Sequence, residues 1–303
     1  MTVSIKVLQD WLELHRRITV PVNLHLLNGK SRHRISLDVL WSYSKRRVLG
    51  LTEMLLTPFQ TADKVHRVMC KTGTPTLDSL LDGGFETGLV YLFYGSDKIH
   101  SDLLRAAVHA QLPLTSGGFS SPSIMIDSSN MADIVKLRDY SFQLRLEPES
   151  VMDMIYISRA FNSSQTYDLV INHLDKFFER IPAKLLILPG LVDLFVNEGL
   201  DAERTRQMTH LAARINAFTL RHHLVTLIST RLESRHSLYP PVGKTLASSA
   251  QVHIHVDETP MRTVYSLTKH PSQPNRTESL VKRVSAFGVT LPLDYFFGDD
   301  SST

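Results

Sequence analysis

Residues 90–112 read VYLFYGSDKIHSDLLRAAVHAQL, and this stretch decides the fold. An apolar run ends at Gly95, a short polar segment follows, and apolar residues then recur at helical spacing from Leu103 to Val108. A buried strand that passes through a glycine-led loop into a helix is the arrangement in which many α/β proteins hold a phosphate group. Here the loop has no glycine-lysine pair. The stretch therefore predicts the architecture of a phosphate loop and leaves its chemistry in question.

Outward from this stretch, short apolar runs alternate with segments of helical period, which is typical of βαβ units and a largely parallel sheet. The expected strands are residues 90–95, 123–128, 154–160, 184–190 and 224–230. The expected helices between them are residues 101–112, 132–146, 166–181 and 203–221. Residues 252–256, 261–270 and 278–286 predict a strand-rich C-terminal extension of the sheet. We therefore predict an α/β fold with a central, mostly parallel sheet flanked by helices.

The chain divides by composition into a basic head and a larger body. Residues 1–70 contain eleven Lys or Arg against five acidic residues, whereas the remainder contains 22 against 25. Residues 1–57 have the pattern of short amphipathic helices, and we predict that they form a small helical N-terminal domain, followed by a linker (58–70) and the α/β core (71–303). The basic head suits a nucleic acid or an acidic partner, and it equally suits an ordinary solvated surface.

Composition also bounds the class of protein. No run approaches the roughly 18 apolar residues of a membrane span, and the N-terminus has charges where a signal peptide is apolar, so we expect an intracellular protein without a membrane partner. Cys70 is the single cysteine, which excludes an internal disulfide and an all-cysteine metal site. The chain has fourteen histidines, and two pairs of them are close in sequence: His222-His223 and His253/His255. No Cys, Asp or Glu lies at ligand spacing near either pair, so we expect no metal.

Four segments, in the right order, resemble the RecA-like recombinase family, in particular its archaeal RadA/RadB and eukaryotic strand-exchange branch. They are TGTPTLDSLLDGGFETG (72–88), DMIYISRAFNSSQ (153–165), PVGKTLASSAQVHIHV (241–256) and TKHPSQPNRTESLVKRVSAFGV (268–289). The resemblance covers about residues 58–289, and its specificity lies in the co-occurrence of the segments. It implies a RecA-like core.

A fifth segment, FQTADKVHR (59–67), resembles the linker of these recombinases. In that family an F-x-x-A motif adds an edge strand to the neighbouring protomer and places its Phe and Ala in pockets there, which is a known recognition mode. The resemblance implies that Phe59 and Ala62 bind a partner. The motif is short, and the other reading of Phe59 is an ordinary core residue.

Aligned with the family's phosphate loop, G-x-x-x-x-G-K-[ST], the opening stretch keeps only Gly95. His100 stands at the second glycine, Ser101 at the lysine and Asp102 at the magnesium-binding Ser/Thr. A carboxylate at the last position repels a phosphate by on the order of a few kcal/mol. Lys98 is a candidate to replace the lysine from a shifted position, and Ser101 and Asp102 read as helix-capping residues.

The family's other catalytic positions have changed as well. Pro189 stands where the Walker B Asp belongs, and we expect Asp193 to lie beyond the strand, as a capping or solvent-facing residue. Ser129 replaces the general-base Glu that follows Asp127, and Thr230-Arg231 replaces the Asn-Gln phosphate sensor. Phosphoryl transfer depends on positioning and metal electrostatics. We therefore expect a degenerate nucleotide site, no ATPase activity and no cofactor.

The DNA-facing segments are less informative. The first loop, residues 196–204, contains three acidic residues and one Arg, which is a poor match to a phosphate-binding surface. Residues 231–244 carry Arg231, Arg235 and Lys244, which are candidates for phosphate contact. Lys269 and Arg276, in the C-terminal segment, are further tentative candidates. The competing reading for each is a solvated surface charge.

The resemblance and the losses together favour a non-catalytic recombinase paralogue of homologous recombination and double-strand break repair. Such a subunit would dock on a recombinase or another paralogue, as part of a hetero-oligomer, and nucleate, cap or stabilise a filament on DNA, single-stranded or filament-bound. We expect it in the nucleus of a eukaryote or in the cytoplasm (nucleoid) of an archaeon. The alternative is a structural RecA-fold subunit of a hetero-oligomeric ring such as the Elongator accessory subcomplex, which acts in tRNA modification.

Overall fold

The computed structural model describes residues 68–231 and 244–282, and of Lys244 and Thr245 only the backbone. The predicted helical domain (1–57), most of the predicted linker with Phe59 and Ala62, and Arg235 lie outside the described residues. The described residues all belong to one compact unit.

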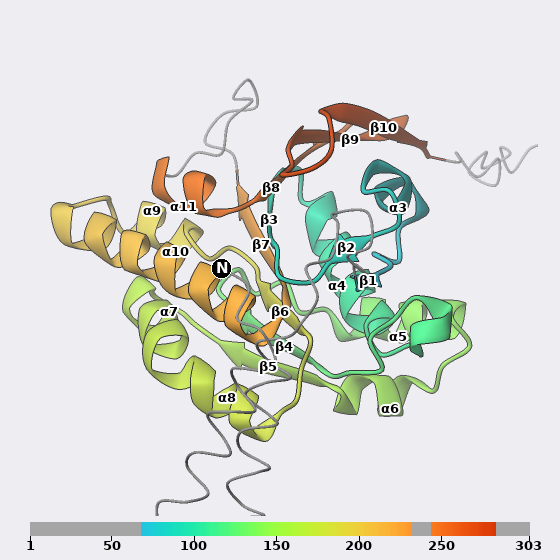
Figure 1. Ribbon diagram of the computed structural model, residues 1–303, viewed down its shortest axis with the longest axis horizontal. Helices are drawn as coiled ribbons and strands as arrows, with labels where there is room; N and C mark the ends of the chain where they lie inside the picture. Colours follow the sequence, from blue (N-terminus) through green and yellow to red (C-terminus); the bar gives the residue numbers. More distant parts are fainter. Residues whose placement is uncertain (1–67, 232–243, 283–303) are drawn as a thin grey trace, which may run out of the picture. The chain divides into compact units, whose positions relative to one another are not determined.

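A sheet of eight strands forms the centre of this unit, in the order β10-β9-β8-β3-β7-β6-β4-β5 (Figure 1). Strands β3 to β8 pair in parallel, and β9 and β10 extend the sheet in antiparallel pairing at one edge. The strands are β3 (Val90–Gly95), β4 (Ser123–Asp127), β5 (Ile155–Arg159), β6 (Leu185–Leu188), β7 (Val225–Arg231), β8 (Val252–Glu258), β9 (Arg262–Lys269) and β10 (Arg276–Val281). A separate two-stranded sheet pairs β1 (Met69–Cys70) with β2 (Phe85–Glu86). The predicted mostly parallel sheet with a C-terminal extension is confirmed.

Helices cover both faces of the sheet (Figure 1). They are α3 (Pro75–Leu80), α4 (Lys98–His109), η2 (Leu114–Ser116), α5 (Ile134–Gln143), α6 (Pro148–Asp153), α7 (Ser163–Asp168), η3 (Leu169–His173), α8 (Leu174–Arg180), α9 (Asp193–Asn197), α10 (Ala202–His222) and α11 (Lys244–Ser249). Among the described residues, no helix is both long and apolar enough to cross a membrane.

The central strand β3 shows how the sequence builds two cores. Its side chains alternate between the faces, as a strand requires. Tyr91 and Phe93 are buried against α4 and α5 in one apolar cluster. Val90, Leu92 and Tyr94 are buried against α8 and α10 in the other. A run that is apolar on both faces is what a central parallel strand needs, because helices cover both of its sides.

Three helical predictions differ from the structure. The helix predicted over 132–146 is the shorter α5, Ile134–Gln143. Helix α4 begins at Lys98, three residues before the predicted start. The helix predicted over 166–181 begins earlier, at Ser163, because the Asn162 side chain caps it by accepting from the Gln165 N–H at 2.8 Å. Helix α6 was not predicted: its six residues are too few to show a helical period, although Pro148 at its first turn is a recognised start signal.

Candidate functional site

The position of the phosphate loop lies at the carboxyl end of β3, between β7 and β8. Gly95 ends this strand and pairs with Arg231 of β7 and Val256 of β8. Gly95 has φ +124°, and a Cβ on it would lie 2.1 Å from the Val256 carbonyl oxygen. Only glycine fits there. The one retained residue of the family's loop is thus required for packing against β8, whether or not a phosphate binds.

The loop after Gly95 is closed by its own hydrogen bonds. The Lys98 N–H donates to Ser96 Oγ at 3.1 Å, the Ile99 N–H to the Ser96 carbonyl at 3.2 Å, and the His100 N–H to the Asp97 carbonyl at 3.1 Å. The Ser96 N–H donates to the Val256 carbonyl at 2.8 Å. A phosphate loop works by leaving such N–H groups for the anion. Here the helix begins early and these groups already have acceptors.

Asp102 is buried and is not a capping residue, which corrects the prediction for Ser101 and Asp102. The helix begins at Lys98, so both residues lie inside its first turns. The Asp102 carboxylate accepts from Thr74 Oγ at 2.8 Å, from Lys98 Nζ at 2.8 Å and from the Tyr265 hydroxyl at 2.9 Å. Burial and the Asp102 charge raise the pKa of Tyr265, which therefore stays a donor. The site of the magnesium-binding Ser/Thr is occupied by an internal ionic network.

Lys98 belongs to the same network, so it does not replace the family's lysine as free phosphate-binding charge. Its ammonium lies 2.8 Å from Asp102, one turn along the helix, and its side chain is only 20% exposed. The ion pair with Asp102 thus offsets the positive charge of Lys98.

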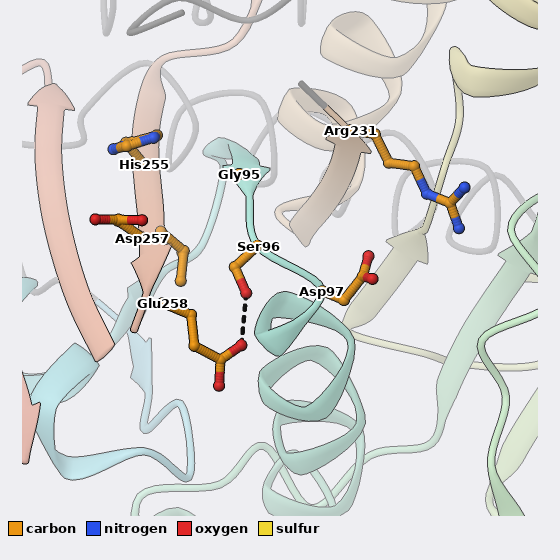
Figure 2. Close-up of a pocket in the computed structure, with 8 residues that line it drawn as sticks. Gly95, Ser96, Asp97, Arg231, His255, Asp257 and Glu258 are labelled. Atoms are coloured by element: carbon orange, nitrogen blue, oxygen red, sulfur yellow. Dashed lines mark hydrogen bonds between the residues drawn. The ribbon is translucent and has the colours of Figure 1, made fainter. Parts of the chain in front are cut away.

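An acidic hollow of about 600 Å³ lies beside the loop (Figure 2). Asp97, Asp257 and Glu258 line it together with Ser96 and Arg231. Glu258 accepts from Ser96 Oγ at 2.7 Å and pairs with Lys282 Nζ at 2.6 Å, and these hydrogen bonds hold its pKa below the usual range. The three carboxylates outnumber the two cations at this hollow, Arg231 and the Lys282 that pairs with Glu258, so the hollow is unfavourable for an anion.

His100 stands at the family's second glycine and fills space near the strand ends. Burial lowers the pKa of this half-buried imidazole, opposed by Asp97 and reinforced by Arg231. His100 is therefore neutral near pH 7. It adds a side chain where a phosphate loop requires none, and it adds no positive charge in exchange.

The end of β6 is closed as well. Pro189 and Gly190 follow this strand and are buried. The Pro189 carbonyl accepts from the Ser128 N–H at 3.2 Å, and a Cβ on Gly190 would lie 2.6 Å from the Ser129 Cβ. Asp127 turns inward, where one oxygen accepts from the backbone N–H groups of Ser129 and Met131, each at 3.1 Å. The turn at Pro189-Gly190 thus contacts the turn at Ser128-Ser129, and neither Pro189 nor Ser129 has a carboxylate for a metal.

Asp193 was predicted to cap a helix or face solvent, and that prediction is wrong. Its side chain is 14% exposed and points back to the end of β7, where Oδ1 accepts from Thr230 Oγ at 3.0 Å and from the Arg231 N–H at 3.2 Å. The Pro189-Gly190 turn brings the chain back toward the sheet and places Asp193 at the strand ends. Sequence spacing from β6 could not reveal this.

The tentative DNA contacts divide into two groups. Lys269 donates to the carbonyls of Ala247, Ser248 and Ala250 at 2.6–3.3 Å, and Arg276 Nε donates to the Leu80 carbonyl at 2.6 Å. Both cations hold the ends of helices, α11 and α3, so we remove them from the candidates. Arg231 stays a candidate because its side chain is 64% exposed. The structure describes only the backbone of Lys244, and Arg235 lies outside the described part of the chain.

Metal chemistry finds no support in the part of the chain that the structure describes, where no three His, Cys, Asp or Glu side chains are grouped to hold an ion. His253 instead lies with Nε2 2.7 Å from the Ala247 carbonyl. The sequence did not single out Asp97, Asp257, Glu258 or Tyr265. The sequence indicates these residues only by their positions near the ends of predicted strands. In α/β proteins, residues that face a ligand commonly lie at the carboxyl ends of strands.

The fold and this position agree with a comparison against known protein families. The family model described as Rad51 matches residues 63–231, which is more than half of the chain. The chain belongs to the Rad51 family. The Rad51 match includes the loop at Gly95, the turn at Pro189 and the β7 end at Arg231, so all the altered positions lie inside the region that defines the family.

Individual relatives of this Rad51-family chain are recombination proteins. The mouse meiotic recombination protein DMC1/LIM15 homolog is 27% identical over 185 residues, 58% of this chain and 54% of the relative. The DNA repair and recombination protein RadA of Ignicoccus hospitalis is 27% identical over 176 residues, 53% of each chain. The DNA repair protein RAD51 of Mycosarcoma maydis is 30% identical over 163 residues, 51% of this chain and 48% of the relative. The chain spans about half the length of the curated relatives it matches.

Proposed function

We propose that this chain is a non-catalytic Rad51-family subunit that acts in homologous recombination and DNA double-strand break repair. It docks on a recombinase or on another paralogue and nucleates, caps or stabilises a filament on DNA. Its relatives are named for recombination and repair, which supports the process. The closed loop at Gly95 carries the rest of the proposal.

The reasoning from the loop is energetic. To admit a phosphate, the chain would have to break the bonds that bind the Lys98, Ile99 and His100 N–H groups and bring the anion beside Asp97, Asp257 and Glu258. A like-charge contact in such a hollow costs on the order of a few kcal/mol. If the chain binds no nucleotide, it acts through the surfaces by which it docks on other proteins. An interface of this kind does not open and close with nucleotide turnover.

One sheet edge suits docking by strand addition. Among the described residues, β5 pairs with β4 alone, so its outer side is available to another strand. Tyr156 and Ile157 on β5 are 43% and 41% exposed. Exposed apolar side chains on an edge strand are typical of a surface that pairs with another chain. An F-x-x-A strand from a neighbouring protomer supplies apolar side chains to such an edge. This chain's own Phe59 and Ala62 would bind a neighbour in the same way.

The proposal is tested by capture of partners from native cell extract on the immobilised full chain. We expect recombinases or paralogues to be retained by the wild type and lost with Phe59→Glu. Phe142→Glu, at a phenylalanine that is 61% exposed on α5, is the matched control and should retain them. Circular dichroism of each variant checks that the fold is intact.

Two outcomes would contradict the proposal. If Elongator subunits are captured in place of recombinases, the chain is a ring subunit of that class. If recombinases are captured equally by Phe59→Glu, the linker is not the interface.

A further inference from the structure

Strand β10 forms the other edge of the sheet, and among the described residues this edge is open to a further strand. β10 pairs with β9 alone and lies at the outside of the sheet (Figure 1). Natural edge strands are commonly protected by lysine or proline on the strand or by a bulge. β10 reads RTESLV, has neither residue, and pairs with β9 without a bulge. Two apolar side chains at its end, Leu280 and Val281, are 38% and 71% exposed. The edge therefore has the features of a strand that pairs with another chain.

The register of β10 on β9 shows which backbone groups point away from the sheet. Val281 lies opposite Arg262, and the Lys282 N–H donates to the Met261 carbonyl at 2.9 Å. Along a strand, the backbone groups of successive residues point to opposite sides. The even-numbered residues of β10 therefore bond to β9. The N–H and C=O groups of the odd-numbered residues point away from it: Thr277, Ser279 and Val281.

The side chains on one face of β10 form a pattern that is complementary to itself. Glu278, Leu280 and Lys282 share the face on which Tyr265 of β9 is buried, because Glu278 lies opposite Tyr265 and side chains alternate along a strand. Leu280 thus lies midway between a carboxylate and an ammonium. Lys282 pairs with Glu258 at 2.6 Å, whereas Glu278 has no hydrogen bond or ion pair with another described residue.

We propose that β10 pairs in antiparallel fashion with β10 of a second copy of this chain, about a two-fold axis at Leu280. Leu280 then contacts the partner's Leu280, and Glu278 of each copy lies opposite the partner's Lys282. These are non-hydrogen-bonded pairs, in which side chains lie closest together, and opposite charges placed in this way stabilise a strand pair. Ser279 and Val281 exchange about four main-chain hydrogen bonds with the same two residues of the partner.

Charge complementarity favours a second copy as the occupant of this edge. A two-fold axis brings each residue opposite a partner residue that meets it in return, so one strand supplies both charges of both ion pairs. The neighbouring symmetric registers fit less well. An axis at Glu278 places two carboxylates opposite each other, and an axis at Ser279 places Leu280 opposite a carboxylate.

This pairing goes beyond the proposed function and does not depend on it. The strand order begins with β10 and ends with β5, the edge that suits docking by strand addition. A dimer through β10 therefore leaves the β5 edge of each copy available. Such a dimer presents two docking edges to other subunits.

The test is sedimentation velocity of the full chain over a range of concentrations. We expect a monomer–dimer equilibrium with a dissociation constant on the order of 10 µM, because a single strand pair buries less surface than the interface of a stable dimer. Glu278→Lys and Lys282→Glu should each weaken dimerisation about 10-fold, because each variant places like charges opposite each other at both ends of the contact.

An equimolar mixture of the two variants tests the register. In a mixed dimer, opposite charges again face each other at both ends, so we expect the mixture to dimerise within about threefold of the wild-type affinity. Glu179→Lys is the matched control: it makes the same change at an exposed glutamate on α8 and should dimerise as the wild type does. Circular dichroism of each variant checks that the fold is intact.

Four results would overturn the inference. The wild type sediments as a monomer at every concentration, or Glu278→Lys and Lys282→Glu dimerise as the wild type does. The mixture of the two folded variants stays monomeric, or the dimer is lost with Phe59→Glu and not with Glu278→Lys, which assigns self-association to the linker. Failure to dimerise with normal capture of recombinases contradicts this inference alone. A dimer that depends on Glu278, in a chain that captures no recombinase or paralogue, contradicts the proposed function alone.

Discussion

At the residue scale, the buried Asp102 carboxylate holds together side chains from three separate parts of the chain. A single carboxylate takes the place of a small hydroxyl residue and gathers three donors, from Thr74, Lys98 and Tyr265. A buried charge with all its partners in place is tolerated, but removal of one member leaves the others unpaired in a medium of low polarity. The stability of this part of the fold therefore depends on the Asp102 carboxylate.

We expect Asp102→Ala to lower the free energy of unfolding by about 3–5 kcal/mol, because it leaves the Lys98 ammonium and two hydroxyl groups without their acceptor. Urea denaturation measures this loss. Asp139→Ala is the control: its ion pair with Arg138 is about half exposed at both ends and should cost less than about 1 kcal/mol. Equal losses for the two variants would contradict the role of the network.

Sequence spacing predicted which residue occupies the magnesium-binding position but not what it does there. Two partners of Asp102, Thr74 and Tyr265, lie 28 and 163 residues away along the chain. No local pattern connects them. The prediction that Asp102 is a helix cap was wrong because spacing alone cannot say where the helix begins.

At the scale of elements, the β9–β10 hairpin holds helix ends in place. Lys269, on β9, binds three carbonyls around the end of α11, and Arg276, on β10, binds the end of α3. Cations at helix C-termini satisfy carbonyls that lack partners within the helix. The basic character of this segment thus has a structural cause in the described residues.

We expect Lys269→Met to lower the free energy of unfolding by about 1–3 kcal/mol, since three carbonyls lose a charged donor. Because the Lys269 ammonium is held by these carbonyls in the wild type, the variant's affinity for a fluorescein-labelled oligothymidylate should stay within about twofold of the wild type. Thermal denaturation and fluorescence anisotropy measure the two quantities. A large loss of affinity without a loss of stability would return Lys269 to the DNA contacts.

The elements themselves were well predicted where burial is complete. β3 has the predicted bounds, and the bounds of β6 and β7 lie within about two residues of the predicted ones. A continuous apolar run is typical of a central parallel strand, because helices bury both faces of such a strand. The start of α4 was missed by three residues. The first residue of α4 depends on whether the loop N–H groups bond to the chain or to a phosphate. The spacing of apolar residues does not show which acceptor these groups have.

At the scale of the whole molecule, several half-buried histidines make stability depend on pH. Burial lowers the pKa of four histidines below the ordinary value of an imidazole: His100, His109, His253 and His255. The unfolded chain therefore binds more protons than the folded chain once the pH falls below about 6.5. Their contribution to stability is fully present above that pH and decreases as the pH falls.

We expect the free energy of unfolding to decrease between pH 7 and pH 5.5, and the decrease to be smaller in the double variant His100→Gln/His109→Gln. Glutamine does not titrate, so two of the groups that take up protons on unfolding are removed. Urea denaturation at a series of pH values measures the slope. An unchanged slope in the double variant would contradict this account of the two residues.

Within residues 63–231, which match the Rad51 family model, the amides of the loop after Gly95 bond to the protein's own groups, and we propose that the loop binds no nucleotide. The direct test is titration of the full chain with a fluorescent ATP analogue and Mg²⁺, together with a hydrolysis assay. We predict no saturable binding up to about 1 mM and no turnover above background, because the loop amides are already bonded and the hollow is acidic. Saturable binding below about 100 µM, with turnover that Lys98→Ala abolishes, would contradict the account.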